Sequence, residues 1–120
     1  MKKELAMFLA SNLRNAWISD GIIYVYVRKS KRLFLEVEGV LLPAIDIANI
    51  QIKKHNQGKG YFKEFIQHVE SLGVNVFVES VQNKQLKENL LKHGYKQTLT
   101  GESVYKFYSA EENTNVFHSS

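Results

Sequence analysis

The stretch Gln57-Gly58-Lys59-Gly60-Tyr61-Phe62 decides the fold of this 120-residue chain. It follows an apolar segment, Ala44 to Lys53, that we predict to be a strand, and it precedes apolar residues at helical spacing. Gly58 and Gly60 allow positive φ angles and a close approach of a ligand to the backbone. The free N–H groups and the dipole of the helix N-terminus attract negative charge. The stretch therefore predicts a turn that binds phosphate or pyrophosphate.

The composition is that of a single globular domain. Hydrophobic residues make up 44% of the chain, which suffices for one core. The chain has no cysteine, and its four histidines lack the spacing of a metal site, so we expect no metal. No apolar run approaches the roughly 20 residues that span a membrane, and the basic N-terminus is followed by no apolar signal segment. We expect a soluble, cytoplasmic protein.

The formal net charge is +4, and the basic residues gather in two clusters. We interpret the first, Arg28 to Arg32, as a solvated hairpin turn. The second, Lys53 to Lys59, surrounds the glycine turn, where a phosphorylated ligand explains it. Nucleic-acid binding remains a weaker alternative.

Before the glycine turn, the pattern predicts one helix and three strands. The helix spans Lys2 to Trp17 because its apolar residues recur at helical spacing. The strands are Ile22 to Arg28, Leu33 to Glu38 and Ala44 to Lys53, and the first two form a hairpin.

The third predicted strand changes the parity of its apolar residues. Ile45 and Ile47 share one face of a regular strand, whereas Ile50 and Ile52 would share the other. A β-bulge at Ala48-Asn49 would restore the register. A strand buried on both faces would explain the pattern equally well.

After the glycine turn, two helices alternate with three strands. The first helix ends at Gly73, the strand Val74 to Val78 follows, and the second helix spans Asn83 to His93. Tyr95 to Leu99 and Ser103 to Tyr108 form the last pair of strands. The order α-β-β-β-α-β-α-β-β predicts one α/β domain with a mixed sheet over residues 1–108, and a polar, flexible tail over 109–120.

Two familiar nucleotide-binding motifs do not fit the glycine turn. A Walker A loop places a hydroxyl for magnesium where this chain has Gly60. The dinucleotide fingerprint requires a third glycine that is missing here. The remaining interpretation is a shorter turn that binds the pyrophosphate of coenzyme A at the helix N-terminus.

The region from Ala44 to Tyr95 resembles the GNAT superfamily of acyl-CoA-dependent N-acetyltransferases. Gln57 to Phe62 follows that family's Q/R-x-x-G-x-G/A signature, with Phe62 at a position usually held by glycine or alanine. Asn83, Gly94 and Tyr95 resemble its second conserved block. The resemblance implies a three-layer α/β fold with a mixed, mostly antiparallel sheet that is splayed at a β-bulge and has helices on both faces.

The resemblance also implies the ligands. Acetyl-CoA would be the acyl donor, and a primary amine of a small molecule, peptide or protein would attack its thioester directly. The residues implied to bind the donor are the strand positions Ile50 and Ile52, the turn residues Gln57, Gly58, Lys59, Gly60, Tyr61 and Phe62, and Asn83.

The chain departs from the family pattern at one catalytic position, because Leu90 stands where the family commonly has a tyrosine acid. Tyr105 and Tyr108 are candidate substitutes, and Asp46 and Glu79 are candidate general bases. Each of these residues would also suit an ordinary structural role. A non-catalytic acyl-CoA-binding module is therefore the first alternative, and a homodimer that completes a sheet edge is left open.

Overall fold

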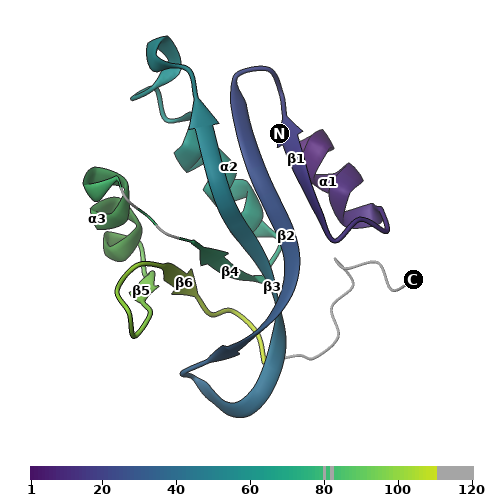
Figure 1. Cartoon of the computed structure of the whole chain (residues 1–120), viewed down its shortest axis with the longest axis vertical. Coiled ribbons are helices and arrows are strands. Elements are labelled where there is room, and N and C mark those ends of the chain that lie inside the picture. The colour runs from purple at the N-terminus through teal and green to yellow at the C-terminus, as the bar shows by residue number, and fades with distance from the viewer. Residues whose placement is uncertain (80, 82, 111–120) are drawn as a thin grey trace.

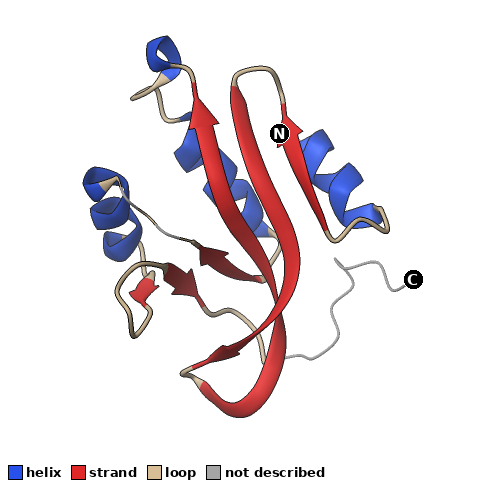
Figure 2. Ribbon diagram, viewed as in Figure 1, coloured by secondary structure: helices blue, strands red, loops and turns tan. Residues whose placement is uncertain are grey.

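The computed structural model describes residues 1–79, 81 and 83–110, which form one six-stranded mixed sheet with three α-helices (Figures 1 and 2). The strands lie in the order β1-β2-β3-β4-β6-β5, and of these neighbouring pairs β3 and β4 alone run parallel. This confirms the predicted α/β class and the mostly antiparallel sheet. In chain order the elements are α1 (Lys2–Ala10), β1 (Asn15–Ser19), β2 (Ile23–Phe34), β3 (Val37–Ile52), the 3₁₀ helix η1 (Lys54–Asn56), α2 (Tyr61–Ser71), β4 (Asn75–Val78), α3 (Lys84–Lys92), β5 (Lys96–Gln97) and β6 (Val104–Lys106).

The predicted N-terminal helix is too long. Helix α1 ends at Ala10, where the Ser11 hydroxyl donates to the Phe8 carbonyl at 2.6 Å and accepts from the Leu13 amide at 3.2 Å. Ser11 thus turns the chain out of the helix. Trp17, predicted to be helical, lies in β1 and packs on Tyr26 of β2, with ring centroids 5.3 Å apart. The cross-strand aromatic contact outweighs the helical spacing of the sequence.

The predicted position of the turn in the first hairpin is also wrong. The basic stretch Arg28 to Arg32 lies inside β2, which continues to Phe34, and the turn falls at Leu35-Glu36. The arginines are not solvated turn residues, because Arg28 and Arg32 form ion pairs with Asp46 and Glu79. Acidic partners on β3 and after β4 therefore let a basic segment continue as a strand.

The predicted β-bulge is present. Tyr26 pairs with Asn49 and Val27 with Ile47, so Ala48 is the extra residue of β3. The alternative explanation, a strand buried on both faces, is correct for Leu42 to Ile47, which are all buried. The pairing of β3 with β4 ends near the bulge. Among the described residues, its last backbone hydrogen bond runs from the Glu79 amide to the Ile47 carbonyl at 3.0 Å. The predicted splay of two parallel strands lies at this point.

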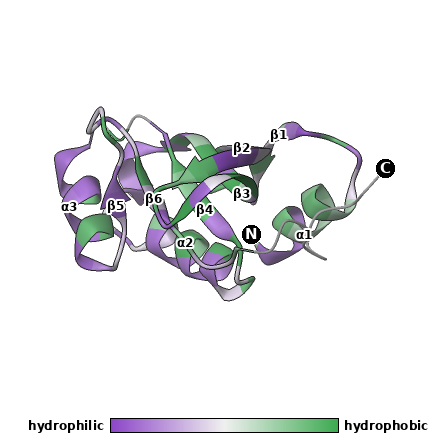
Figure 3. Cartoon of the chain, turned by 90° about the horizontal axis from the view of Figure 1, so that it is seen from below, coloured by the Kyte–Doolittle hydropathy of each residue, from purple (hydrophilic) through white to green (hydrophobic). Residues whose placement is uncertain are grey.

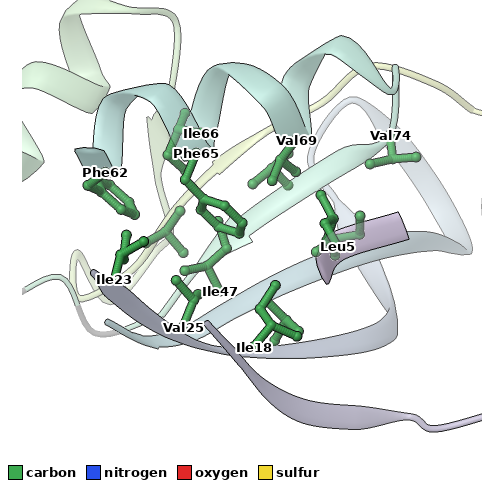
Figure 4. Packing of buried hydrophobic residues seen from close by; sticks show 14 of the residues in the cluster. Leu5, Ile18, Ile23, Val25, Ile47, Phe62, Phe65, Ile66, Val69 and Val74 are labelled. Atoms are coloured by element: carbon green, nitrogen blue, oxygen red, sulfur yellow. The ribbon is translucent and has the colours of Figure 1, made fainter. Parts of the chain in front are cut away.

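The described helices pack on one face of the sheet, whereas we expected helices on both. In Figure 3, α1 and α2 lie on the same side of the strands. Buried residues of α1, α2 and α3 join those of the strands in one core cluster, which includes Leu5, Phe65, Val69, Val25 and Ile47 (Figure 4). Each such buried side chain contributes about 1.5–3 kcal/mol.

The opposite face carries a smaller cluster to which no described helix contributes. Its buried members are Phe34, Leu42, Ala44 and Tyr105. The long β2–β3 hairpin curls over this face, so that the Phe34 ring lies 5.5 Å from Tyr105 and 5.9 Å from Phe107. The hairpin therefore covers part of the face where we expected a helix.

The described chain ends in an ordered contact. The buried Asn75 accepts hydrogen bonds from the amides of Tyr108 and Ser109 at 2.6 and 3.0 Å. Ser109, which we assigned to a flexible tail, is thus anchored, while 111–120 lie outside the described residues. None of the described helices is long and apolar enough to cross a membrane.

Candidate functional site

The glycine turn forms an open helix N-terminus. Gly60, with φ of 82°, is the N-cap of α2, and Gly58 has φ of 77°. The Gln57 side chain donates to the Ile52 carbonyl at 3.0 Å and ties the turn to the end of β3. The first helical hydrogen bond joins the Glu64 amide to the Gly60 carbonyl at 3.0 Å, so the preceding amides of the first turn can bind an anion.

A cavity of about 570 Å³ extends from this turn between α2 and α3. It brings together eight of the nine residues that the sequence assigned to the acyl donor; Lys59 is the one that does not line it. Asn83 is also the N-cap of α3, where its side chain accepts from the Leu86 amide at 3.0 Å. The eight residues are Ile50, Ile52, Gln57, Gly58, Gly60, Tyr61, Phe62 and Asn83.

The motif missed the part of the cavity wall that lies beyond the turn. These residues recur on α2 and α3 at intervals of three and four, the spacing of one helix face, which was the signal available in the sequence. They are Lys63, Ile66, Gln67 and Glu70 from α2, Gln85, Leu86, Asn89 and Leu90 from α3, and His93 and Tyr95 after it.

Leu90 lies in the cavity wall, where it places a buried methyl-bearing side chain and no hydroxyl. Tyr95 does bring a phenol to this wall, and its hydroxyl donates to Glu70 at 2.9 Å. Burial, followed by the adjacent Glu70 charge, raises the pKa of Tyr95 far above its usual value of 10. Tyr95 therefore stays protonated at neutral pH.

Asp46 is enclosed by donors on the face opposite the cavity. Its carboxylate accepts two hydrogen bonds from Arg32, each 2.8 Å long, and one from Ser30 at 2.6 Å; the Nε of Arg28 lies 3.5 Å away. Asp46 is only 1% exposed. This carboxylate links β2 and β3 and has almost no exposed surface.

Glu79 lies where β3 and β4 separate and is open to solvent. Its side chain is 28% exposed, and its Oε1 contacts both Arg28 and Arg32, the latter at 3.1 Å. The Arg32 guanidinium in turn stacks 3.6 Å from the centroid of the Phe77 ring. Of the two predicted carboxylates, Glu79 is the more exposed, and neither lines the cavity.

Tyr105 packs against the β2–β3 hairpin and forms a hydrogen bond with it. Its ring is buried against Phe34, and its hydroxyl donates to the Glu36 carboxylate at 3.2 Å. Burial and then the Glu36 charge raise its pKa. The residue lies on the face opposite the cavity, so the structure does not bring it to the predicted donor site.

No protein-family model and no curated protein matches the chain, but solved structures do. The KacTA–DNA complex matches with a TM-score of 0.53 and 20% identity over 74% of this chain. AtaT complexed with acetyl-methionyl-tRNA matches with a TM-score of 0.55 and 12% identity over 70% of this chain. A third match is a mutant AtaT toxin bound to acetyl-CoA and to the C-terminus of the antitoxin AtaR. Its TM-score is 0.52, and its identity is 16% over 70% of this chain.

KacT and AtaT are GNAT-fold proteins. This chain has the GNAT fold. The match spans between 57% and 64% of the length of these neighbours. The bulged β3, the glycine turn and α2 are the GNAT elements that the sequence had identified, and they line the same cavity.

Proposed function

We propose that the chain is an acetyl-CoA-dependent N-acetyltransferase that moves an acetyl group to a primary amine. The observation that carries this proposal is that eight of the nine expected donor-binding residues line one cavity. The AtaT structure that contains acetyl-CoA supports it, because that protein has the same fold. The absence of cysteine and the use of acetyl-CoA suit the cytoplasm.

The donor would bind along two elements. The amides at the N-terminus of α2 hold the pyrophosphate, and Lys59 adds positive charge beside them. Beyond Ile47, β3 has lost β4 as a neighbour, so the backbone of Ala48 to Ile52 can pair with the pantetheine arm as a further strand would.

The chemistry requires no enzyme nucleophile. The acceptor nitrogen attacks the thioester carbonyl, its proton passes to Glu79 directly or through water, and the C–S bond breaks. An unpaired N–H at the bulge would stabilise the oxyanion. Leu90 supplies no acid, so the thiolate would leave unprotonated and take its proton from solvent.

The acceptor is an amine that reaches the splay near Glu79. AtaT is seen with an acetylated methionyl-tRNA, which makes an aminoacyl ester of RNA one class of amine to test. Small amines, peptides and proteins are the others. The basic charge of the chain is compatible with the RNA class.

A pair of glycine variants tests the donor site. Gly60 and Gly73 lie at the two ends of α2 with φ of 82° and 71°, and a Cβ on either meets nothing within 4 Å. Replacing each by alanine should therefore cost a similar 1–2 kcal/mol of backbone strain, roughly. Only Gly60 lines the cavity.

Titration calorimetry with coenzyme A gives the readout. We expect submillimolar binding to the wild type, about tenfold weaker binding to Gly60→Ala, and unchanged binding to Gly73→Ala. A wild-type chain that binds no coenzyme A at millimolar concentration would refute the proposal.

A non-catalytic acyl-CoA-binding module remains the second candidate, and Leu90 is the observation that favours it. Release of free thiol from acetyl-CoA, measured across amines that include an aminoacyl-tRNA, separates the two functions. Donor binding without thiol release for any amine would identify a binding module.

A further inference from the structure

Strand β1 forms the outer edge of the sheet (Figure 1), where it pairs with β2 and with no other described strand. The Arg14 carbonyl accepts a hydrogen bond from the Lys29 amide at 2.7 Å. Hydrogen-bonding groups alternate along an antiparallel pair, so Arg14, Ala16 and Ile18 turn theirs to β2. The N–H and C=O groups of Asn15, Trp17 and Ser19 consequently point to the open edge.

Among the described residues, this short edge strand lacks most of the features that protect a sheet edge. Asn15 to Ser19 contain no lysine, proline or bulge. Trp17 is 50% exposed at the centre of the strand, and two more apolar side chains are exposed nearby, Met7 on α1 and Leu13 just before β1. An unprotected strand of this kind is a template for another strand.

The segment is complementary to itself when two copies run antiparallel about Trp17. In that register Trp17 faces Trp17, Asn15 faces Ser19, and Arg14 faces Asp20 of the other copy. Arg14 makes no recorded ion pair with any described residue. The register thus matches outward-pointing backbone groups with one another and brings each Arg14 opposite an Asp20. The Asp20 carboxylate accepts from the Ile22 and Ile23 amides at 2.9 and 3.1 Å and lies 3.8 Å from the N-terminal amine, so Arg14 would be a further cation beside it.

We infer that β1 pairs with the β1 strand of a second copy in this register, which joins two six-stranded sheets into one. The interface is isologous, with the two-fold axis at Trp17. A register shifted by two residues, centred on Asn15, shortens the paired segment and separates Arg14 from Asp20. The inference does not depend on the proposed function.

Sedimentation equilibrium and tryptophan fluorescence test the association. We expect a concentration-dependent rise from 13.8 kDa to twice that mass. Trp17 is the only tryptophan, so its emission should shift to shorter wavelength over the same concentrations as the interface covers it. Arg14→Glu places like charges opposite each other and should weaken association at least tenfold.

Single cysteines test the register, because the chain has none of its own. Trp17→Cys brings two thiols together across the axis and should form a disulfide-linked dimer on mild oxidation. Asn15→Cys is the matched control: its thiols lie four residues apart along the strands, roughly 13 Å, beyond the ~7 Å limit between Cα atoms of a disulfide. Circular dichroism checks that both variants fold.

A monomer at every concentration would overturn the inference. Equal cross-linking of the Trp17→Cys and Asn15→Cys variants would overturn the register.

Discussion

At the scale of single residues, Asp46 and Glu79 share the same two arginines but differ in access. Arg28 and Arg32 contact both carboxylates, yet Asp46 is buried and fully bonded while Glu79 remains partly exposed. A buried carboxylate that two guanidiniums hold stabilises the strands around it. The exposed one at the splay is the residue that we propose as the general base. The two residues should therefore respond differently to loss of charge.

We predict that Asp46→Asn lowers the free energy of unfolding by about 3 kcal/mol, because it removes a buried negative charge that two guanidiniums hold. Glu79→Gln should cost less than about 1 kcal/mol, since the Glu79 side chain is itself 28% exposed. Urea denaturation measures both. Equal losses would contradict the division of roles.

The Glu79→Gln variant also tests the proposed catalytic role of Glu79. Glu79→Gln should lower kcat for acetyl transfer roughly 10²-fold with little change in the KM for acetyl-CoA, as expected for a general base. Full activity in this variant would exclude Glu79 and leave water as the proton acceptor.

At the scale of elements, the β2–β3 hairpin depends on one carboxylate at its tip. Glu36 accepts from Lys96 at 2.9 Å and from Tyr105 at 3.2 Å, which joins the tip to β5 and β6. Burial alone would raise the pKa of Glu36, but the hydrogen bonds from Lys96, its own backbone and Tyr105 outweigh it and lower that pKa below 4.5. The hairpin therefore stays in place while Glu36 is ionised.

This gives a pH dependence with a definite sign. Since the pKa of Glu36 is lowered on folding, its stabilisation is complete above pH 4.5 and is lost as the pH falls through the folded-state value. We predict that wild type is more stable than Glu36→Gln at about pH 7, and that the difference shrinks as the pH falls below 4.5. Thermal unfolding of both proteins across this range is the measurement. A difference that persists at low pH would contradict the mechanism.

At the scale of the whole molecule, the two faces of the sheet carry unequal parts of the core. The helix-bearing face holds nineteen of the buried residues of the two clusters, and the hairpin face holds four. Phe65 lies between α2 and the sheet (Figure 4), whereas Phe34 lies under the hairpin. Stability should depend mainly on the first face.

Two phenylalanine variants test this inequality. Phe65→Ala should lower the free energy of unfolding by about 4 kcal/mol, because rigid elements surround the cavity that it creates. Phe34→Ala should cost roughly half as much, since the hairpin can collapse onto the space. Chemical denaturation of both variants measures the difference, and a larger loss for Phe34→Ala would contradict it.

Much of the fold could be predicted from local patterns. The parity change between Ile47 and Ile50 located the bulge, and Gly58 and Gly60 located the N-terminus of α2, because each pattern depends only on neighbouring residues. The nine predicted donor residues were implied by the family resemblance between Ala44 and Tyr95, and eight of them line one cavity. Helix α1 was overextended because Trp17 has helical spacing but a strand partner that is remote in sequence.

By itself, the sequence determined the α/β class, the glycine turn and the helix after it, and it gave a bulge at Ala48-Asn49 as one of two explanations of the strand pattern. Those features follow from backbone freedom and apolar periodicity within a few residues. Tertiary structure alone decided that Arg28 to Arg32 continue a strand, that Asp46 is enclosed while Glu79 is open, and that the described helices lie on one face. These outcomes depend on ion pairs and packing between residues far apart in the chain, and no local pattern records which partner a charge or an aromatic ring will meet.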